Sequence, residues 1–383
     1  MTMEYYRGML TQRTRVEAFR RALAAAVRPG DRVLEIGTGL GTYAFFAADA
    51  GAAKVWAVEG AAVAAVARAI ARRNGYEDRV EVIRGWFPGV TLPERVDVLI
   101  YEEYPSRLLD DRTYAVLGRL HRDVLAPGAR VVPHRARIRL APMYSERVWG
   151  LVGPLAPDGD TAYDIDWSPS REYVVNAPLH APLRHEDLRH EPQVIADVTL
   201  YPLPPAAALA GEASWTFERE TVIHGLGCWF DLEVGRDVWL SNAPGDDPGS
   251  WGYLYLPIPE ALTVSRGETL VGRVAPEVTS EGAPSWLTWE VRCGGKRYRG
   301  HEFKSFPASL ADVLPRSPSW VPQLTDSAQL ELQILRLADG TRSVEEIARV
   351  LRAGDGAVNL REARNLVAGT LARRTKSPAA WGS

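Results

Sequence analysis

Hydrophobic and polar positions in the first third of the chain follow a regular alternation of two patterns. Short apolar runs typical of buried strands occur at 31–36, 54–58, 79–84 and 96–100. Segments with helical spacing occur at 13–27, 42–50, 60–73 and 114–125, the last closed by Pro127-Gly128. Strands that alternate with helices predict a parallel sheet with helices on both faces. We therefore expect a doubly wound, Rossmann-like α/β domain at 31–132, preceded by an N-terminal helical segment at 1–30.

The pattern changes near Val132 to short alternating strands with frequent proline and glycine. Examples are 135–140, 195–201 and 229–234. This pattern is typical of an antiparallel β domain, barrel-like or sandwich-like, and we place it at 133–307. Within it, the stretch 150–192 is rich in Pro, Asp and His and lacks a clean period. Because it is longer than an ordinary loop, we interpret it as part of an inserted arm at about 145–192.

Helical spacing returns near the end of the sequence, over 327–374. Asp339-Gly340 predicts a turn, and Ser343 stands before the acidic pair Glu345-Glu346, as at the start of a helix. We expect a small helical module at 325–376.

Composition and charge narrow the classes of partner. Among 383 residues the net charge is −3, so neither nucleic acid nor an anionic membrane is an expected partner. The most apolar stretch, 61–71, is too short to span a bilayer. Two distant cysteines, Cys228 and Cys293, exclude a disulfide framework and a zinc cluster, so we expect no metal and a reducing compartment. The first ten residues do not read as a signal peptide, and a cytoplasmic location is expected.

A glycine-rich segment links the first strand of the α/β domain to the next helix. It has the spacing GxGxG, which differs from the GxGxxG of dinucleotide sites. The acid of Glu59-Gly60 ends the following strand, where a carboxylate can accept hydrogen bonds from both hydroxyls of a ribose. An aromatic pair after the third strand can stack on adenine. These features predict a site for S-adenosylmethionine, made of Glu35, Gly37, Thr38, Gly39, Gly41, Glu59, Gly60, Gly85, Trp86 and Phe87. A nicotinamide or flavin site and a purely structural glycine turn are the alternatives.

An acidic loop follows the fourth strand, at the edge of the sheet where the reactive methyl is expected. It contains Glu102-Glu103-Tyr104 and ends in Asp110-Asp111. Carboxylates match the planar fork of a guanidinium, which stays protonated at neutral pH. We therefore expect a cationic acceptor gripped by Glu102 and Asp111, with transfer by direct in-line displacement. The alternative is a solvated loop in which one aspartate simply caps the next helix.

At about 5–305 the chain resembles the protein arginine methyltransferase family. The segment 6–15 resembles the family's opening helix, whose closing arginine, here Arg15, binds the methionine carboxylate, and which brings Tyr6 to the acceptor. The stretch 96–127 aligns without a gap to the family's "double-E" region, with Glu102 and Asp111 as its acids and Glu102 also beside the cofactor. Further similar stretches are 224–234, an early barrel strand, and 241–251, which ends in the Thr-His-Trp loop.

This resemblance implies a function and an assembly. The expected reaction moves a methyl group from S-adenosylmethionine to a guanidinium nitrogen of arginine, in a peptide, a protein or the free amino acid. The expected substrate contacts are Tyr6, Glu103, Tyr104, Ser250 and Trp251. Because the arm lies where the family inserts its dimerisation arm, a head-to-tail homodimer is also expected.

Several positions depart from the family pattern. The second acid is the shorter Asp111, and Glu103-Tyr104-Pro105 replaces Trp-Met-Gly. Ser250 replaces the histidine of the Thr-His-Trp loop, and Gln12 replaces the acid that pairs with that histidine. Two other readings therefore stay open: methylation of a different small-molecule or peptide nucleophile in natural product biosynthesis, and a regulatory protein on a methyltransferase scaffold.

The C-terminal module has a resemblance of its own. The segment 330–373, with 337–348 within it, resembles small winged-helix modules attached to methyltransferases and the leader-peptide-binding modules of peptide-modifying enzymes. We expect it to present a substrate or to regulate the enzyme, and the alternative is a helical cap without a binding role.

Overall fold

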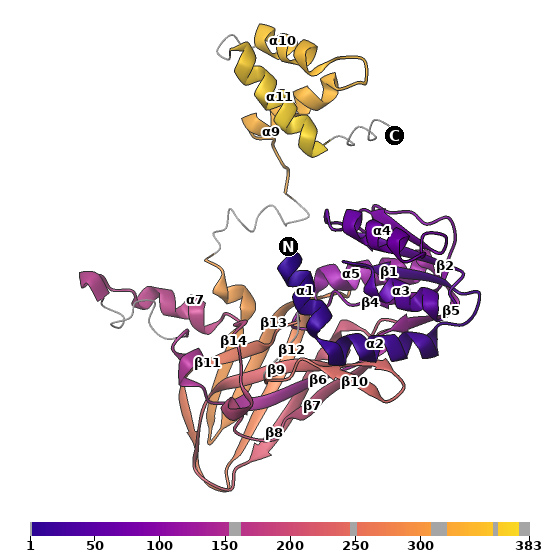
Figure 1. Cartoon of the computed structure of the whole chain (residues 1–383). Coiled ribbons are helices and arrows are strands. Elements are labelled where there is room, and N and C mark those ends of the chain that lie inside the picture. The colour runs from indigo at the N-terminus through magenta and orange to yellow at the C-terminus, as the bar shows by residue number, and fades with distance from the viewer. Residues whose placement is uncertain (1, 153–161, 246–250, 308–319, 355–358, 375–383) are drawn as a thin grey trace. The chain divides into compact units, whose positions relative to one another are not determined.

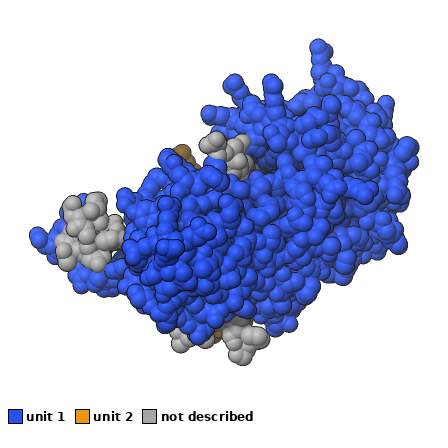
Figure 2. Space-filling view, turned by 90° about the horizontal axis from the view of Figure 1, so that it is seen from below, with its two compact units in different colours: residues 1–307 blue, residues 308–383 orange. Residues whose placement is uncertain are grey.

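The structure is a computed structural model of the whole chain, and it describes residues 2–152, 162–245, 251–307, 320–354 and 359–374. The chain divides into two compact units, residues 1–307 and 308–383, which Figure 2 colours blue and orange. The division of the first unit into three parts that the sequence predicts stays a prediction.

A parallel five-stranded sheet forms the first part of the larger unit. Its strands are β1 (Arg32–Ile36), β2 (Lys54–Glu59), β3 (Val80–Arg84), β4 (Val96–Tyr101) and β5 (Leu125–Val132). They lie in the order β3-β2-β1-β4-β5, and every neighbouring pair is parallel. The chain reverses its direction of winding between β1 and β4, where the carboxyl ends of parallel strands leave a crevice for ligands. The predicted doubly wound domain is confirmed.

Helices cover both faces of this sheet (Figure 1). They are α1 (Met3–Thr11), α2 (Arg13–Ala26), α3 (Thr42–Asp49), α4 (Ala64–Arg73) and α5 (Asp111–Arg119). The buried side of α2 carries Phe19 and Leu23, which pack against α3 and against strands of the β domain that follows in the sequence. Helix α2 is thus held between the two parts of the larger unit.

The helix predicted at 114–125 ends at Val124, and its last turn differs in form from the prediction. After α5 the chain makes one π-helical turn, at Leu120–Val124, and strand β5 begins at Leu125 and runs through Pro127-Gly128. The pairing of β4 with β5 shifts register between the pairs Val96–Leu125 and Val98–Arg130. Pro127 and Gly128 fall in this bulge on an edge strand, where a missing N–H and a positive φ are tolerated.

An antiparallel β domain forms the rest of the larger unit. Its strands are β6 (Arg135–Met143), β7 (Gln193–Thr199), β8 (Gly211–Thr216), β9 (Thr221–Gly235), β10 (Val238–Ser241), β11 (Leu254–Val264), β12 (Thr269–Val278), β13 (Pro284–Cys293) and β14 (Lys296–His301). One sheet has the order β10-β9-β6-β7 with β11 also on β9, and the other the order β14-β13-β12-β8. The predicted barrel-like domain is confirmed. The arm contains α6 (Glu146–Trp149) and α7 (Arg171–Val175), and it projects away from the strands in Figure 1.

The smaller unit is helical in its described residues. Its helices are α9 (Asp326–Leu337), α10 (Val344–Gly354) and α11 (Leu360–Arg374), packed around Ile334, Ile347 and Val367. Ser343 and Glu346 exchange hydrogen bonds in the capping pattern that the sequence predicts. Because residues 320–354 and 359–374 contain no strand, the likeness to winged-helix modules extends here only to the helices.

In the described parts of both units, every helix is too short or too polar to cross a membrane.

Candidate active site

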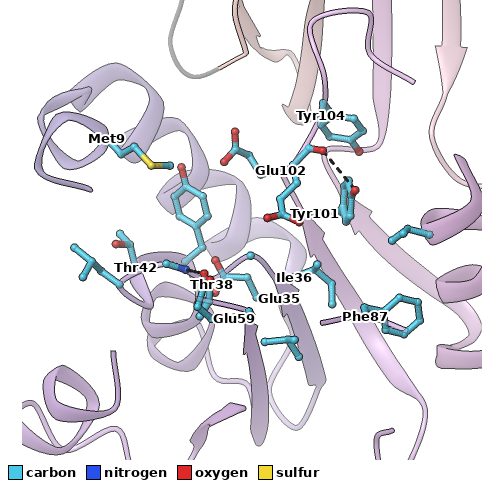
Figure 3. A pocket seen from close by; sticks show the side chains of 18 of the residues that line it. Met9, Glu35, Ile36, Thr38, Thr42, Glu59, Phe87, Tyr101, Glu102 and Tyr104 are labelled. Carbon is cyan, nitrogen blue, oxygen red and sulfur yellow. Dashed lines mark hydrogen bonds between the residues drawn. The ribbon is translucent and has the colours of Figure 1, made fainter. Parts of the chain in front are cut away.

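A pocket of about 530 Å³ lies at the carboxyl ends of β1, β2 and β4. Its walls come from α1, from the loops after β1, β2, β3 and β4, and from the first turn of α5. In Figure 3, Glu102 lies between Met9 of α1 and the rings of Tyr101 and Tyr104. The pocket therefore occupies the crevice that the strand order creates.

The glycine loop after β1 forms the floor. Gly37 and Gly39 have φ values of +74° and +57°, a region that residues with a Cβ rarely adopt. The amides of Gly37 and Thr38 donate to the carbonyl of Val58 at 2.9 and 3.1 Å, which fixes the loop to β2. Gly41 lies outside the pocket lining and precedes α3 with φ +91°. A contact between Gly41 and a cofactor therefore stays a prediction.

Glu59 holds this loop from the end of β2. Its Oε2 accepts a hydrogen bond from the amide of Gly39 at 2.9 Å, and its Oε1 accepts one from Ala61 at 2.7 Å. An ionised carboxylate has about four lone-pair sites, so capacity remains for the hydroxyls of a ribose. Beside it, a Cβ on Gly60 would lie 2.2 Å from the ring of Trp86. The indole of Trp86 is 62% exposed and forms a flat wall of the pocket, together with Gly85 and Phe87.

Glu102 stands at the opposite wall, directly after β4. Arg15 of α2 forms an ion pair with its carboxylate and lies over the ring of Trp251, 4.9 Å from the centroid. The indole N–H of Trp251 donates to the backbone carbonyl of Glu102 at 3.1 Å. Burial raises the pKa of Glu102 to about 7, although Arg15 acts to lower it. One oxygen, Oε1, is buried without a hydrogen-bond partner among the described residues.

The pocket as a whole is acidic. Glu35 lies at its base, where it accepts a hydrogen bond from the Thr38 hydroxyl and where burial raises its pKa to about 8. The described lining carries five carboxylates, from Glu35, Glu59, Glu102, Glu103 and Asp110, and one guanidinium, from Arg112. Such a pocket favours ligands that carry positive charge.

The position of Asp111 differs from the prediction. Asp111 is the first residue of α5, exposed and outside the described pocket lining, and its carboxylate accepts from the amide of Arg112 at 2.8 Å. The preceding Asp110 lines the pocket and caps α5 by accepting from the Thr113 amide at 2.7 Å. The structure does not bring Glu102 and Asp111 together.

The remaining predicted residues fall into three groups. Tyr6, Glu103, Tyr104 and Trp251 line the pocket. Arg15 lies behind Glu102, outside the described lining, and Ser250 lies outside the described residues. Sequence reasoning missed Tyr43, Tyr101 and Arg112, and it named Asp110 only as a member of the acidic loop or a helix cap. The spacing of Asp110 and Thr113 is the capping signal that places the helix start, and hence Asp110 and Arg112.

The comparisons with known proteins agree with this architecture. A family model described as "Arginine methyltransferase oligomerization subdomain" matches residues 148–283. The "Histone-arginine methyltransferase CARMER" of Drosophila persimilis is 28% identical over 294 residues, 70% of this chain and 53% of its own length. The "Probable histone-arginine methyltransferase CARMER" of Drosophila melanogaster matches with the same identity and coverage. The chain thus spans about half the length of these curated relatives.

Two solved structures share the fold. "Trypanosoma brucei PRMT1 enzyme-prozyme heterotetrameric complex with AdoHcy" matches with a TM-score of 0.67 at 22% identity, over 76% of this chain and 95% of that one. Protein arginine methyltransferase 10 of Arabidopsis thaliana matches with a TM-score of 0.61 at 22% identity, over 78% of this chain and 97% of that one.

Proposed function

We propose that the chain is a member of the protein arginine methyltransferase family, that it binds S-adenosylmethionine and that it methylates a guanidinium nitrogen of arginine in a peptide or protein. The observation that carries this proposal is the acidic pocket at the carboxyl ends of β1, β2 and β4. Its direct test is incubation with S-adenosylmethionine and arginine-containing peptides, followed by analysis of the hydrolysate for methylarginine.

The residues present fit S-adenosylmethionine. Glu59 would bind the ribose hydroxyls, Trp86 and Phe87 would flank the adenine, and Arg15 would pair with the methionine carboxylate. The positive φ values of Gly37 and Gly39 allow the backbone to approach the ligand closely. When bound, S-adenosylmethionine supplies the methyl group as an electrophilic sulfonium.

The acceptor is held by Glu102 in this proposal. Its unpartnered Oε1 is buried, and a buried acceptor atom gains most from a charged donor such as a guanidinium N–H. Arg15 and Trp251 fix the other side of the residue, so the carboxylate is held in place before the acceptor binds. Glu102 would thereby turn one guanidinium nitrogen toward the methyl group and offset the positive charge that develops there.

Activity should rise with pH through the pKa of Glu102. Only the ionised carboxylate binds a cation well, and burial raises its pKa to about 7. The positive charge of the bound donor lowers this pKa, so we expect the acid limb of kcat/KM for the acceptor at or below about pH 7. The measurement is a pH profile at saturating S-adenosylmethionine. A flat profile from about pH 5.5 to 8 would contradict this role of Glu102.

The second acid of the site can be identified by two matched variants. Asparagine caps helices about as well as aspartate, so Asp110→Asn removes charge and keeps the cap of α5. Since Asp110 lines the pocket and Asp111 does not, we expect Asp110→Asn to lower kcat/KM about tenfold and Asp111→Asn less than about twofold. A larger loss in Asp111→Asn would support the role of Asp111 that the family alignment implies.

The guanidinium of Arg112 favours free arginine as a second candidate acceptor. Arg112 lines the pocket near Glu103, and its side chain has no hydrogen bond or salt bridge within the described residues. A guanidinium and a carboxylate together suit the carboxylate and ammonium of an amino acid. Competition between free arginine and an arginine peptide for methyl transfer distinguishes the two acceptors.

We further propose a homodimer formed through the arm, because the oligomerization subdomain model covers 148–283. The exposed apolar side chains of the arm, Leu151, Tyr163, Ile165 and Tyr173, support an interface there. The two cysteines are buried and unpaired, which supports a reducing, cytoplasmic location.

A further inference from the structure

Trp251 connects the β domain to the wall of the pocket that carries Glu102. Its indole N–H donates to the carbonyl of Glu102 at 3.1 Å, and its ring supports the guanidinium of Arg15 at 4.9 Å. The ring is only 6% exposed and packs on Phe230 of β9, with centroids 5.7 Å apart. One side chain from the segment between β10 and β11 thus touches both members of the Arg15–Glu102 ion pair.

The backbone beside Trp251 is held in turn by Asn242. This residue follows β10 and is fully buried. Its side-chain oxygen accepts from the amide of Phe230 at 2.8 Å, and its side-chain nitrogen donates to the carbonyl of Gly252. Its own amide also donates to the carbonyl of Phe230, at 3.3 Å. Asn242 therefore joins the residue under the Trp251 ring to the residue directly after Trp251.

We propose that Asn242 is a positioning residue for the active site, which acts by fixing the Trp251 indole against Glu102 and Arg15. The inference rests on the proposed function, because it assigns Arg15 and Glu102 to the cofactor and acceptor. A glycine follows Trp251 with φ +65°, so the chain turns sharply at the point that Asn242 holds. Without the hydrogen bond from Asn242 to the Gly252 carbonyl, the Trp251 indole keeps its contact with Phe230 but loses its fixed direction. Arg15 and Glu102 then lose a shared support.

The first test follows the indole N–H itself and needs no activity. The nuclear magnetic resonance signal of the Trp251 indole is identified as the one missing in Trp251→Phe. In the wild type we expect slow exchange of this proton with solvent. In Asn242→Ala we expect exchange at least about tenfold faster, because the hydrogen bond to Glu102 opens more often. Unchanged exchange in a folded Asn242→Ala protein would overturn the proposal.

The second test is a double-mutant cycle on the dissociation constant of S-adenosylhomocysteine, measured by calorimetry. Asn242→Ala and Trp251→Phe should each weaken binding about fivefold to tenfold, through Arg15. If Asn242 acts through Trp251, the dissociation constant of the double variant should be about that of the single variant that binds less tightly. Independent, multiplying effects would show that Asn242 matters only for general stability.

A matched control exists in the same domain. The indole N–H of Trp289 donates to the carbonyl of Pro257 at 2.7 Å, and this ring is as buried as that of Trp251. Trp289→Phe should leave the dissociation constant within about twofold, alone or with Asn242→Ala. Should Asn242→Ala fail to fold, Asn242→Asp keeps the acceptor for Phe230 and replaces the donor to Gly252 by an oxygen that cannot hold its carbonyl. Absence of S-adenosylhomocysteine binding by the wild type would instead contradict the proposed function, and the exchange test would still decide the role of Asn242.

Discussion

Replacing Glu102 by Gln is expected to lower kcat at least about 100-fold while the dissociation constant of S-adenosylmethionine changes less than about fivefold. The amide keeps the shape of the side chain but removes the charge that holds the guanidinium. A charge-assisted hydrogen bond contributes about 1.5–3 kcal/mol, so loss of the one that Oε1 would accept from the guanidinium accounts for this factor. The measurement is steady-state kinetics with an arginine peptide, together with calorimetric titration of the cofactor.

Glu103→Gln is the matched comparison for this variant. Glu103 also lines the pocket, but its side chain lies over Gly37, where a Cβ would be 2.6 Å from Oε1. We expect this variant to lose less than about tenfold in kcat. Equal losses in the two variants would show that the total charge of the pocket matters more than Glu102. Wild-type turnover in Glu102→Gln would exclude the proposed role altogether.

Replacing Glu59 by Gln is expected to raise the dissociation constant of S-adenosylmethionine about 100-fold. Both oxygens of Glu59 accept backbone hydrogen bonds, from Gly39 and Ala61. An amide has one oxygen, so its NH₂ group must face one of these donors and disturb the glycine loop. The ribose would also lose its charged acceptor. Calorimetry measures the change, and kcat at saturating cofactor should fall far less than the affinity.

Glu81→Gln controls for the removal of a carboxylate from the same sheet. Glu81 lies on β3, exposed, and pairs with Lys54 at 3.0 Å. Exposed ion pairs contribute about 0–1 kcal/mol, so the dissociation constant of S-adenosylmethionine for Glu81→Gln should stay within about twofold of the wild type. If Glu59→Gln bound the cofactor as tightly as this control, the ribose assignment would be wrong.

The sequence was most informative where local chemistry dictates the backbone. The three glycines after β1 have positive φ, and the acid that ends β2 bonds the loop they form. Both facts follow from patterns that need no tertiary information: glycine is required where φ is positive, and parallel strands bring their carboxyl ends together. The residues that line this half of the pocket were therefore predictable one by one, apart from Gly41 and Arg15, which lie outside the described lining. Their contacts with a cofactor stay a prediction.

The acceptor half was less predictable, because side-chain direction depends on where a helix starts. A start one residue later would have turned Asp111 rather than Asp110 toward the pocket. The alignment to the family matches sequence positions and contains no information on the helix cap at Asp110. The Asn242–Trp251–Glu102 connection joins residues up to 149 positions apart, so no local pattern could reveal it. The bulge at Pro127-Gly128 was missed for the same reason, since only the edge position of β5 permits it.

The most direct test of the central claim is transfer of a labelled methyl group from S-adenosylmethionine by the purified protein. The acceptors come from an extract of the native organism in which this gene has been deleted. After the reaction, the extract is separated by size and each fraction is hydrolysed. The account predicts label in methylarginine with the wild type and none above background with Glu102→Gln. The fraction that carries the label separates polypeptide from free arginine. Label in another product, or equal label with Glu102→Gln, would contradict it.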